Sequence, residues 1–178
     1  MGGVVANRWT DVSYAGANPV RRAMRWLAAS GPGSRVFAPV MHRLDRPVYR
    51  LTRGRTTLGG LVSGLPVGLL TTTGGRTGRP RSVPLLVLPT SEGLAVIASN
   101  WGRPGPPAWE RNLRADPTAT VSLFGTSFSS RVVEAHGERR EGIWREALGV
   151  YPGFAAYARR AGSRRLGVYV LEDDAAAQ

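Results

Sequence analysis

From residue 67 onward the chain is rich in short apolar segments that are closed by glycine, proline, serine or asparagine. Segments of this kind are typical of β-strands that pair with their neighbours in the sequence. Six of them predict a mostly antiparallel sheet: Val67–Thr73, Arg81–Leu88, Leu94–Ser99, Thr118–Leu123, Phe128–Ala135 and Leu166–Leu171. Because exposed sheet edges invite pairing with other chains, a small barrel is the architecture that this pattern favours.

Helical patterns precede and interrupt the strands. Pro19 suits the first position of a helix, and Gly31-Pro32-Gly33 would end it. Further helices are predicted at Val36–Leu51 (the weakest), Pro107–Ala115, Glu138–Leu148 and Gly153–Ala161. The chain therefore divides into a flexible tail (1–18), a basic helical lead (19–55), one mainly β domain with helices (56–172) and a disordered tail (173–178).

The uncharged stretch Thr56–Gly75 is long enough to raise the question of a membrane span. It is rich in glycine and threonine and is interrupted by Pro66, so we interpret it as a loop followed by a strand. The first twenty residues lack the apolar region of a signal peptide. The expected location is the cytoplasm, and the charge of the chain leaves attachment to an anionic lipid surface open.

The composition excludes several kinds of chemistry. The chain has 24 basic residues, all of them arginine, and 12 acidic residues, which gives a net charge of +12. The absence of lysine excludes Schiff-base and P-loop chemistry, and the absence of cysteine excludes thiolate nucleophiles, zinc fingers and iron–sulfur clusters. The two histidines, His42 and His136, lie in unrelated contexts, so no metal is expected. The Rossmann G-x-G-x-x-G and the hydrolase G-x-S-x-G patterns are also missing from the sequence.

The most distinctive segment is Thr71–Arg81, a turn rich in glycine and arginine between the first two predicted strands. Its glycines permit a tight turn and the close approach of a ligand. Arg76, Arg79 and Arg81 present planar guanidinium groups that suit phosphate or carboxylate oxygens. A solvated basic hairpin explains the same residues, and the composition alone does not decide between these readings.

Two aromatic clusters follow this turn. Ala98–Gly102 and Pro106–Leu113 place Trp101 and Trp109 on either side of a loop rich in glycine and proline, where both could stack on a planar ring. Strand ends and helix N-termini also offer N–H groups without partners. Tyr151–Tyr157 carries aromatic residues three positions apart on one helical face. Core packing remains an open explanation of Trp109 and of the tyrosine-rich cluster.

Together these clusters resemble the deazaflavin-dependent nitroreductase and quinone reductase family of actinobacteria, which uses coenzyme F420. The resemblance rests on four segments in one order: Thr72–Arg81, Ala98–Gly102, Pro107–Pro117 and Tyr151–Tyr157. It implies an α+β fold, namely a split β-barrel of the FMN-binding (flavin-reductase) type. It also implies a reductase that transfers a hydride from reduced F420 to a quinone-like, nitroaromatic or enone acceptor.

The resemblance further implies roles for individual residues. Arg76, Thr77 and Arg81 would hold the cofactor phosphate, and Ser99 and Tyr157 are implied as catalytic residues that bind the acceptor or relay a proton. The cofactor-binding residues that it implies are Arg76, Thr77, Gly78, Arg81, Ser82, Val83, Pro84, Ile97, Ala98, Ser99, Asn100, Trp101, Ala108, Trp109, Arg111, Asn112 and Phe154. The cofactor is anionic through its phosphodiester and glutamate tail, and a chain of charge +12 is suited to it.

Three positions depart from the family pattern. Gly75, Asn100 and Phe154 stand where relatives carry arginine, lysine and tyrosine. Glycine at position 75 removes one donor to the phosphate. Phenylalanine at position 154 lacks the tyrosine hydroxyl, which makes the reduction of nitro compounds doubtful. A catalytically silent protein that binds F420 or lipid on the same barrel is therefore an alternative function.

The arginines allow two further hypotheses. A basic nucleic-acid-binding barrel is disfavoured, because no nucleic-acid-binding motif accompanies the charge and the arginine pairs are scattered over the positions 21–22, 139–140, 159–160 and 164–165. Peripheral contact with an anionic membrane is the second hypothesis. It would use Arg21, Arg22 and Arg25 on the lead helix and would bring a quinone acceptor within reach.

Overall fold

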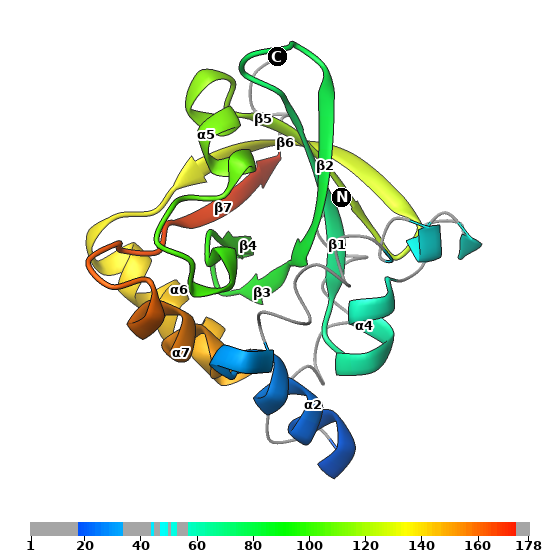
Figure 1. The fold of residues 1–178 in the computed structure, drawn as a ribbon. Helices are drawn as coiled ribbons and strands as arrows, with labels where there is room; N and C mark the ends of the chain where they lie inside the picture. The colour runs from blue at the N-terminus through cyan, green and yellow to red at the C-terminus, as the bar shows by residue number, and fades with distance from the viewer. Residues whose placement is uncertain (1–17, 34–43, 45–46, 50, 53–56, 174–178) are drawn as a thin grey trace.

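The computed structural model describes residues 18–33, 44, 47–49, 51–52 and 57–173. Its centre is a seven-stranded antiparallel sheet with the strand order β2-β1-β5-β6-β7-β4-β3 (Figure 1). The strands are β1 (Val67–Thr73), β2 (Pro80–Leu86), β3 (Leu88–Thr90), β4 (Gly93–Ile97), β5 (Thr118–Leu123), β6 (Thr126–Glu134) and β7 (Val168–Asp173). The fold class is α+β, as the sequence predicts.

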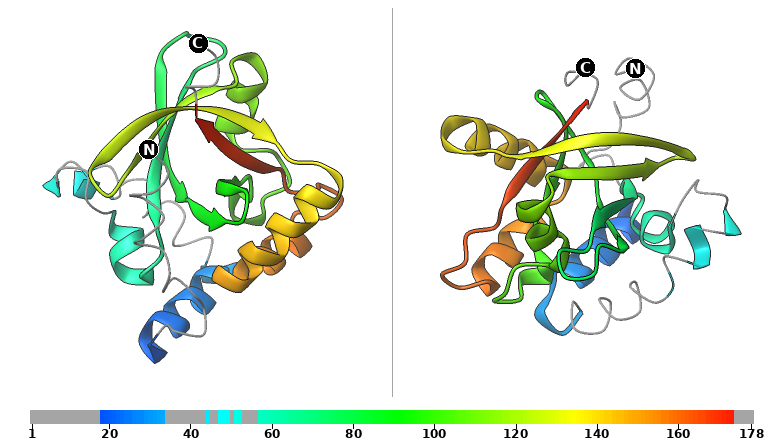
Figure 2. Two further views of the ribbon diagram at one scale, coloured as in Figure 1. Left: turned by 180° about the vertical axis from the view of Figure 1, so that it is seen from behind. Right: turned by 90° about the horizontal axis from the view of Figure 1, so that it is seen from above.

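The sheet curls, but its hydrogen-bonded ladder is open (Figure 2). β2 and β3 form its two edges, although only Val87 separates them in the sequence. The Val87 N–H donates to the Pro66 carbonyl oxygen at 2.9 Å, and this bond breaks the predicted single strand Arg81–Leu88 into two. Seven strands therefore replace the six expected ones. Within the described residues no ladder joins the two edges, so a split barrel is not confirmed.

β1 shows why these residues form strands. Its side chains alternate between half-buried and buried positions from Val67 to Thr72, which is the period of a strand with one face in the core. Thr72 lies opposite Arg81 of β2 on one side and Ala119 of β5 on the other. The strand thus carries the chain from the core to the glycine- and arginine-rich turn at its end.

Three helices lie close to their predicted positions: α5 (Ala108–Ala115), α6 (Gly137–Val150) and α7 (Gly153–Arg160). A short 3-10 turn, η1 (Asn100–Gly102), follows β4 and packs against α7. α6 packs against β3 and β7, and α7 packs against α2 (Pro19–Ala29), so that these three helices gather on one side of the sheet (Figures 1 and 2). One core cluster lies under α6 and α7 and a second lies within the curl of the sheet.

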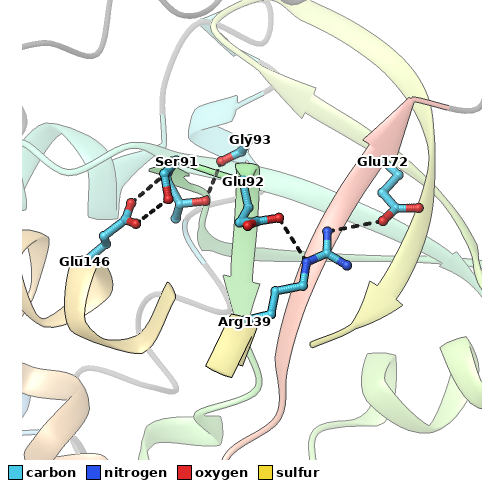
Figure 3. Close-up of polar contacts among 7 residues, drawn as sticks. Ser91, Glu92, Gly93, Arg139, Glu146 and Glu172 are labelled. Atoms are coloured by element: carbon cyan, nitrogen blue, oxygen red, sulfur yellow. Dashed lines mark hydrogen bonds and ion pairs between the residues drawn. The ribbon is translucent and has the colours of Figure 1, made fainter. Parts of the chain in front are cut away.

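Polar contacts fasten α6 to the turn between β3 and β4 (Figure 3). The Glu146 carboxylate accepts hydrogen bonds from the Ser91 backbone N–H at 2.8 Å and from the Ser91 hydroxyl at 2.6 Å. Arg139 forms ion pairs with Glu92 at 3.0 Å and with Glu172 at 3.3 Å. Because these side chains are partly solvated, each ion pair stabilises the fold by at most about 1 kcal/mol. Together these contacts link α6 to the β3–β4 turn and to β7.

α2 begins where the sequence predicts, but one of its arginines is not at the surface. Arg25 is only 3% exposed, and its Nε donates to the Ser63 carbonyl oxygen at 2.9 Å. Arg25 is therefore not one of the arginines that could contact a lipid surface. Membrane contact stays a prediction that rests on Arg21 and Arg22, which are exposed.

α4 (Leu58–Ser63) shows that the loop interpretation of the residues before β1 was wrong. The Thr57 hydroxyl accepts the Gly60 N–H at 3.0 Å, and Gly64 ends the helix with φ of 64°. The sequence did not predict this helix because it contains two glycines, and glycine is a poor helix former. Among the helices that the structure describes, none has the length and apolar character needed to cross a membrane.

Some predictions concern residues that lie outside the described ranges. Most of the predicted helix Val36–Leu51 is among them, as are residues 1–17 and 174–178 of the two predicted tails. β7 extends to Asp173, one residue into the predicted C-terminal tail. The division of the chain into domain and tails otherwise stays a prediction.

Candidate functional site

The turn between β1 and β2 (residues 74–79) is held in shape by its own backbone. The Gly74 N–H donates to the Arg79 carbonyl oxygen at 2.9 Å, and the Gly74 carbonyl oxygen accepts the N–H groups of Thr77 and Gly78 at 3.0 and 2.8 Å. A Cβ on Gly74 would lie 3.0 Å from that Arg79 oxygen, so a side chain there would crowd the turn. The predicted phosphate ligands Arg76, Thr77 and Arg81 are all exposed, and so is Gly78, which was predicted to bind the cofactor.

Asn112 on α5 joins this hairpin to the rest of the candidate site. Its Nδ2 donates to the Thr72 hydroxyl at 3.0 Å, and its Oδ1 accepts the Gly75 N–H at 3.2 Å. Thr72 is 2% exposed, so one of the two bonds is anchored in the core. The bridge brings two segments forty residues apart into direct contact and fixes the hairpin relative to α5.

The predicted residues on β2 lie beside the hairpin on an edge strand. Ser82, Val83 and Pro84 are half-buried and pair with Thr71, Leu70 and Leu69 of β1. The hydroxyls of Ser82 and Thr71 lie 2.8 Å apart. Val83 packs against the core beside Leu70, whereas Ser82 and Pro84 follow the hairpin along one edge of the sheet.

The segment after β4 has an unusual backbone. Asn100, Trp101 and Gly102 have φ values of 45°, 58° and 76°, so three successive residues lie in the left-handed region. For residues other than glycine, this region costs about 1–3 kcal/mol each and persists only where the surroundings impose it. Ile97 and Ala98 are buried, whereas Ser99, Asn100 and Trp101 are half-buried. The Asn100 Nδ2 donates to the Gly105 carbonyl oxygen at 2.8 Å.

Of the predicted cofactor-binding residues on α5, some are exposed and one lies in the core. Ala108 and Arg111 are exposed, and Arg111 donates to the Pro106 carbonyl oxygen at 3.0 Å. Trp109 is 6% exposed and packs edge-on against Tyr169 with 5.5 Å between the ring centroids. The packing explanation of Trp109 is therefore the one that its surroundings support.

Tyr157 is buried with its hydroxyl bound to other groups of the protein. This hydroxyl lies 3.0 Å from the Tyr151 hydroxyl and donates to the Ala28 carbonyl oxygen at 3.2 Å, at the end of α2. Burial, followed by the neighbouring Tyr151, raises the pKa of the Tyr157 hydroxyl. A buried phenol that is held in this way anchors α2, and we no longer assign it the proton relay that the sequence suggested.

Phe154 is a core residue. It is 3% exposed, and its ring lies 5.3 Å from that of Tyr151 and 6.3 Å from that of Trp144. The rings that contact it belong to α6, to α7 and to Tyr151 between these helices, and not to the hairpin or α5. We therefore remove it from the proposed cofactor-binding residues.

A family model described as F420H(2)-dependent quinone reductase matches residues 41–173. The chain belongs to this family. An F420H(2)-dependent quinone reductase of Mycobacterium tuberculosis is 31% identical over 105 residues, which cover 57% of this chain and 69% of that relative. A solved F420-H2 dependent reductase is 35% identical with a TM-score of 0.55, covering 60% of this chain and 94% of the other. A structure described as a domain-swapped dimer is 33% identical with a TM-score of 0.57, covering 71% and 95%.

In this member of the quinone reductase family, two arginines outside the recognised segments contact the loop after β4. Arg164 donates to carbonyl oxygens at both ends of the loop, and Arg160 donates to the Trp101 carbonyl oxygen at 3.3 Å. Burial lowers the pKa of the Arg164 guanidinium, and the Glu110 carboxylate partly offsets this effect. The sequence showed these arginines only as scattered pairs, because backbone carbonyl partners leave no pattern in it.

Glu110 is a second residue that the sequence analysis missed. It is 5% exposed, its Oε1 accepts the Tyr169 hydroxyl at 2.9 Å, and its Oε2 is buried without a hydrogen-bond partner among the described residues. Burial, followed by the charge of Glu110, raises the pKa of Tyr169. The pair ties the first turn of α5 to β7. In the sequence, only its position directly after Trp109 indicated that Glu110 could belong to the site.

Proposed function

We propose that the protein transfers a hydride from reduced coenzyme F420 to a quinone-like acceptor, with nitroaromatic and enone compounds as further acceptor classes. Family membership supports the choice of donor. The observation that carries the proposal is the Asn112 bridge, because it makes the arginine hairpin and α5 parts of one surface. The bridge supports a single site, because it joins the candidate phosphate ligands to the candidate ring-binding residues on α5.

The donors on this surface fit an anionic deazaflavin. Exposed Arg76 and Arg81 offer charge-assisted hydrogen bonds to a phosphodiester, with Thr77 and Gly78 beside them. α5 begins after Pro107 with no side-chain cap, and N–H groups of its first turn would be further donors to an acceptor atom. Residues 82–84 would flank the phosphate. Ser99, Asn100 and Trp101, with Ala108, Arg111 and Asn112, would border the ring, whereas the side chains of Ile97 and Ala98 are buried in the core.

When bound, the reduced deazaflavin supplies the hydride, so the reaction needs no nucleophilic side chain. The protein orients donor and acceptor. Ser99 is half-buried and lies two residues after β4, and its hydroxyl would donate a hydrogen bond to the acceptor or pass a proton to it. With Tyr157 anchoring α2, Ser99 is the one catalytic residue that we retain.

Substitution of the hairpin arginines tests this placement. Arg76→Ala and Arg81→Ala each remove one charge-assisted bond worth roughly 1.5–3 kcal/mol, and should weaken binding of F420 about ten- to a hundredfold. Because the phosphate would be remote from the reacting ring, this contact would be equal in the ground and transition states. KM for reduced F420 should therefore rise while kcat stays nearly constant. Steady-state kinetics and a fluorescence titration measure the two effects.

Arg159→Ala is the control, because Arg159 is exposed on α7 and belongs to none of the proposed ligands. It should leave both constants at their wild-type values. Wild-type affinity in both hairpin variants would contradict the phosphate placement.

A catalytically silent F420-binding protein is the second candidate, favoured by the glycine at position 75. The burial of Phe154 weakens one argument for it, because a side chain in the core is not where an acceptor would bind. A panel of quinone, nitroaromatic and enone acceptors separates the two functions. Binding of reduced F420 without its oxidation by any member of the panel would support the silent protein.

A further inference from the structure

The loop of residues 98–103 is held by the protein around it rather than by its own sequence. Its three left-handed residues include Trp101, a bulky side chain that rarely adopts this backbone, beside Asn100 and Gly102, which tolerate it better. Its internal bonds are few: the Gly102 N–H donates to the Ser99 carbonyl oxygen at 2.8 Å, and the Arg103 N–H donates to that of Asn100 at 3.0 Å. Something outside the loop must impose the conformation.

Arg164 supplies most of that restraint. One of its terminal nitrogens donates to the Ala98 carbonyl oxygen at 2.9 Å, and the other donates to those of Ser99 and Arg103 at 2.9 and 3.0 Å. Its Nε also donates to the Arg103 oxygen at 3.2 Å. A single planar guanidinium thus binds both ends of the loop, which the point charge of a lysine could not do.

Arg160 holds the middle of the same loop. It donates to the Trp101 carbonyl oxygen at 3.3 Å and to the Ala29 carbonyl oxygen at the end of α2. Its guanidinium lies 5.0 Å from the ring centroid of Tyr157. Gly102 packs directly on α7, because a Cβ there would lie 2.9 Å from the Tyr157 carbonyl oxygen. The loop, α7 and α2 are therefore one connected unit.

The neighbours of these arginines are turned outward. Arg165 has a side chain that is 69% exposed and pairs with Glu141 at 2.8 Å, and Arg159 is exposed on α7. In each of the two arginine pairs, one member binds the loop and the adjacent one does not. The chain thus offers a matched control for each inward-facing arginine.

We propose that Arg164 and Arg160 are positioning residues for hydride transfer: they hold residues 98–103 so that Ser99 and Trp101 keep a fixed orientation toward the bound ring. The proposal rests on the proposed function, which places this loop beside the ring. It also makes α2 a part of the site, because the carbonyl oxygen of Ala29 completes the contacts of Arg160.

Amide hydrogen exchange on the protein without cofactor tests the restraint directly. In Arg164→Ala the amides of Gly102 and Arg103 should exchange at least about tenfold faster, because the loop opens more often. The Val132 amide, bonded to the Pro117 carbonyl oxygen at 2.8 Å, is the internal reference and should not change. Arg160→Ala should act in the same direction, whereas Arg165→Ala and Arg159→Ala should match the wild type. Arg164→Lys keeps the charge without the fork and replaces Arg164→Ala if that variant does not fold.

Kinetics with reduced F420 and a quinone then separate positioning from mere packing. In Arg164→Ala, kcat should fall about tenfold while the Kd for F420 changes less than about threefold, since the hairpin supplies the phosphate contacts. Unchanged exchange at Gly102 and Arg103 overturns the proposal, and so does faster exchange with an unchanged kcat. If the wild type neither binds nor oxidises reduced F420, the proposed function fails. The exchange data would then still show whether the two arginines hold the loop.

Discussion

Gly75 lies at the tip of the arginine hairpin, where the family pattern has arginine. A Cβ added there would lie 3.8 Å from the Ala115 Cβ and 3.9 Å from the Asn112 Oδ1, which are ordinary contacts. Its bond to Asn112 uses only the backbone N–H, so Gly75→Arg should fold normally. One added charge-assisted bond of about 1.5 kcal/mol should tighten F420 binding roughly tenfold in a fluorescence titration. Gly75→Gln is the uncharged control, and equal affinities in all three proteins would argue against a phosphate at the hairpin.

Tyr157 is the residue whose assignment the structure changes most. Tyr157→Phe removes the bonds to Tyr151 and Ala28 and should lower the free energy of unfolding by about 1–2 kcal/mol. If the hydroxyl only anchors α2, kcat with a quinone should stay within about twofold of the wild type. Urea unfolding and steady-state kinetics on the same preparations measure both effects. A kcat reduced more than tenfold with wild-type stability would restore the catalytic role.

At the scale of elements, local patterns were sufficient for most strands and for α5, α6 and α7, because each has a period that its sequence displays. The break at Val87 was not predictable, since it depends on a hydrogen bond to Pro66, twenty-one residues earlier. The left-handed η1 turn depends in the same way on Arg164, sixty-six residues after Ala98. The sequence thus indicated which residues could contact a ligand. It did not indicate which distant residues hold them in place.

The end of α5 gives a prediction for pH dependence. Asp116 follows α5 and accepts the Thr118 backbone N–H at 3.0 Å. That bond, with further side-chain bonds from Thr73 and Thr118, lowers the pKa of Asp116. A pKa that is lower in the folded state stabilises the fold above the unfolded pKa of about 4, and this contribution is lost as the pH falls through the folded pKa. Asp116 should therefore contribute fully near neutral pH and not at all in strong acid.

Asp116→Asn isolates this contribution, because the amide oxygen can still accept the Thr118 N–H. Urea unfolding at neutral pH should show the variant less stable by no more than about 1 kcal/mol, since the carboxylate is largely solvated. The difference from the wild type should shrink as the pH is lowered below about 4 and should vanish in strong acid. A difference that is the same at every pH would mean that the charge of Asp116 does not matter.

For the whole molecule, the net charge of +12 is distributed so that the candidate site receives a large share. The hairpin, the loop after β4 and α5 carry six exposed arginines: Arg76, Arg79, Arg81, Arg103, Arg111 and Arg114. The one glutamate on these elements, Glu110, is buried against Tyr169. A field of this sign attracts an anionic ligand before any specific contact forms.

This distribution predicts that salt acts on association and not on the chemical step. Raising the salt from about 20 to 300 mM should lower kcat/KM for reduced F420 about tenfold while kcat stays constant, because screening weakens attraction beyond the Debye length. A deazaflavin without the phosphodiester and glutamates should show no such dependence. Arg79→Gln should weaken the salt effect, whereas Arg145→Gln on α6, which removes the same charge from outside the site elements, should not. If the two variants respond alike, only the total charge matters and the arginines of the site have no special part in capturing the cofactor.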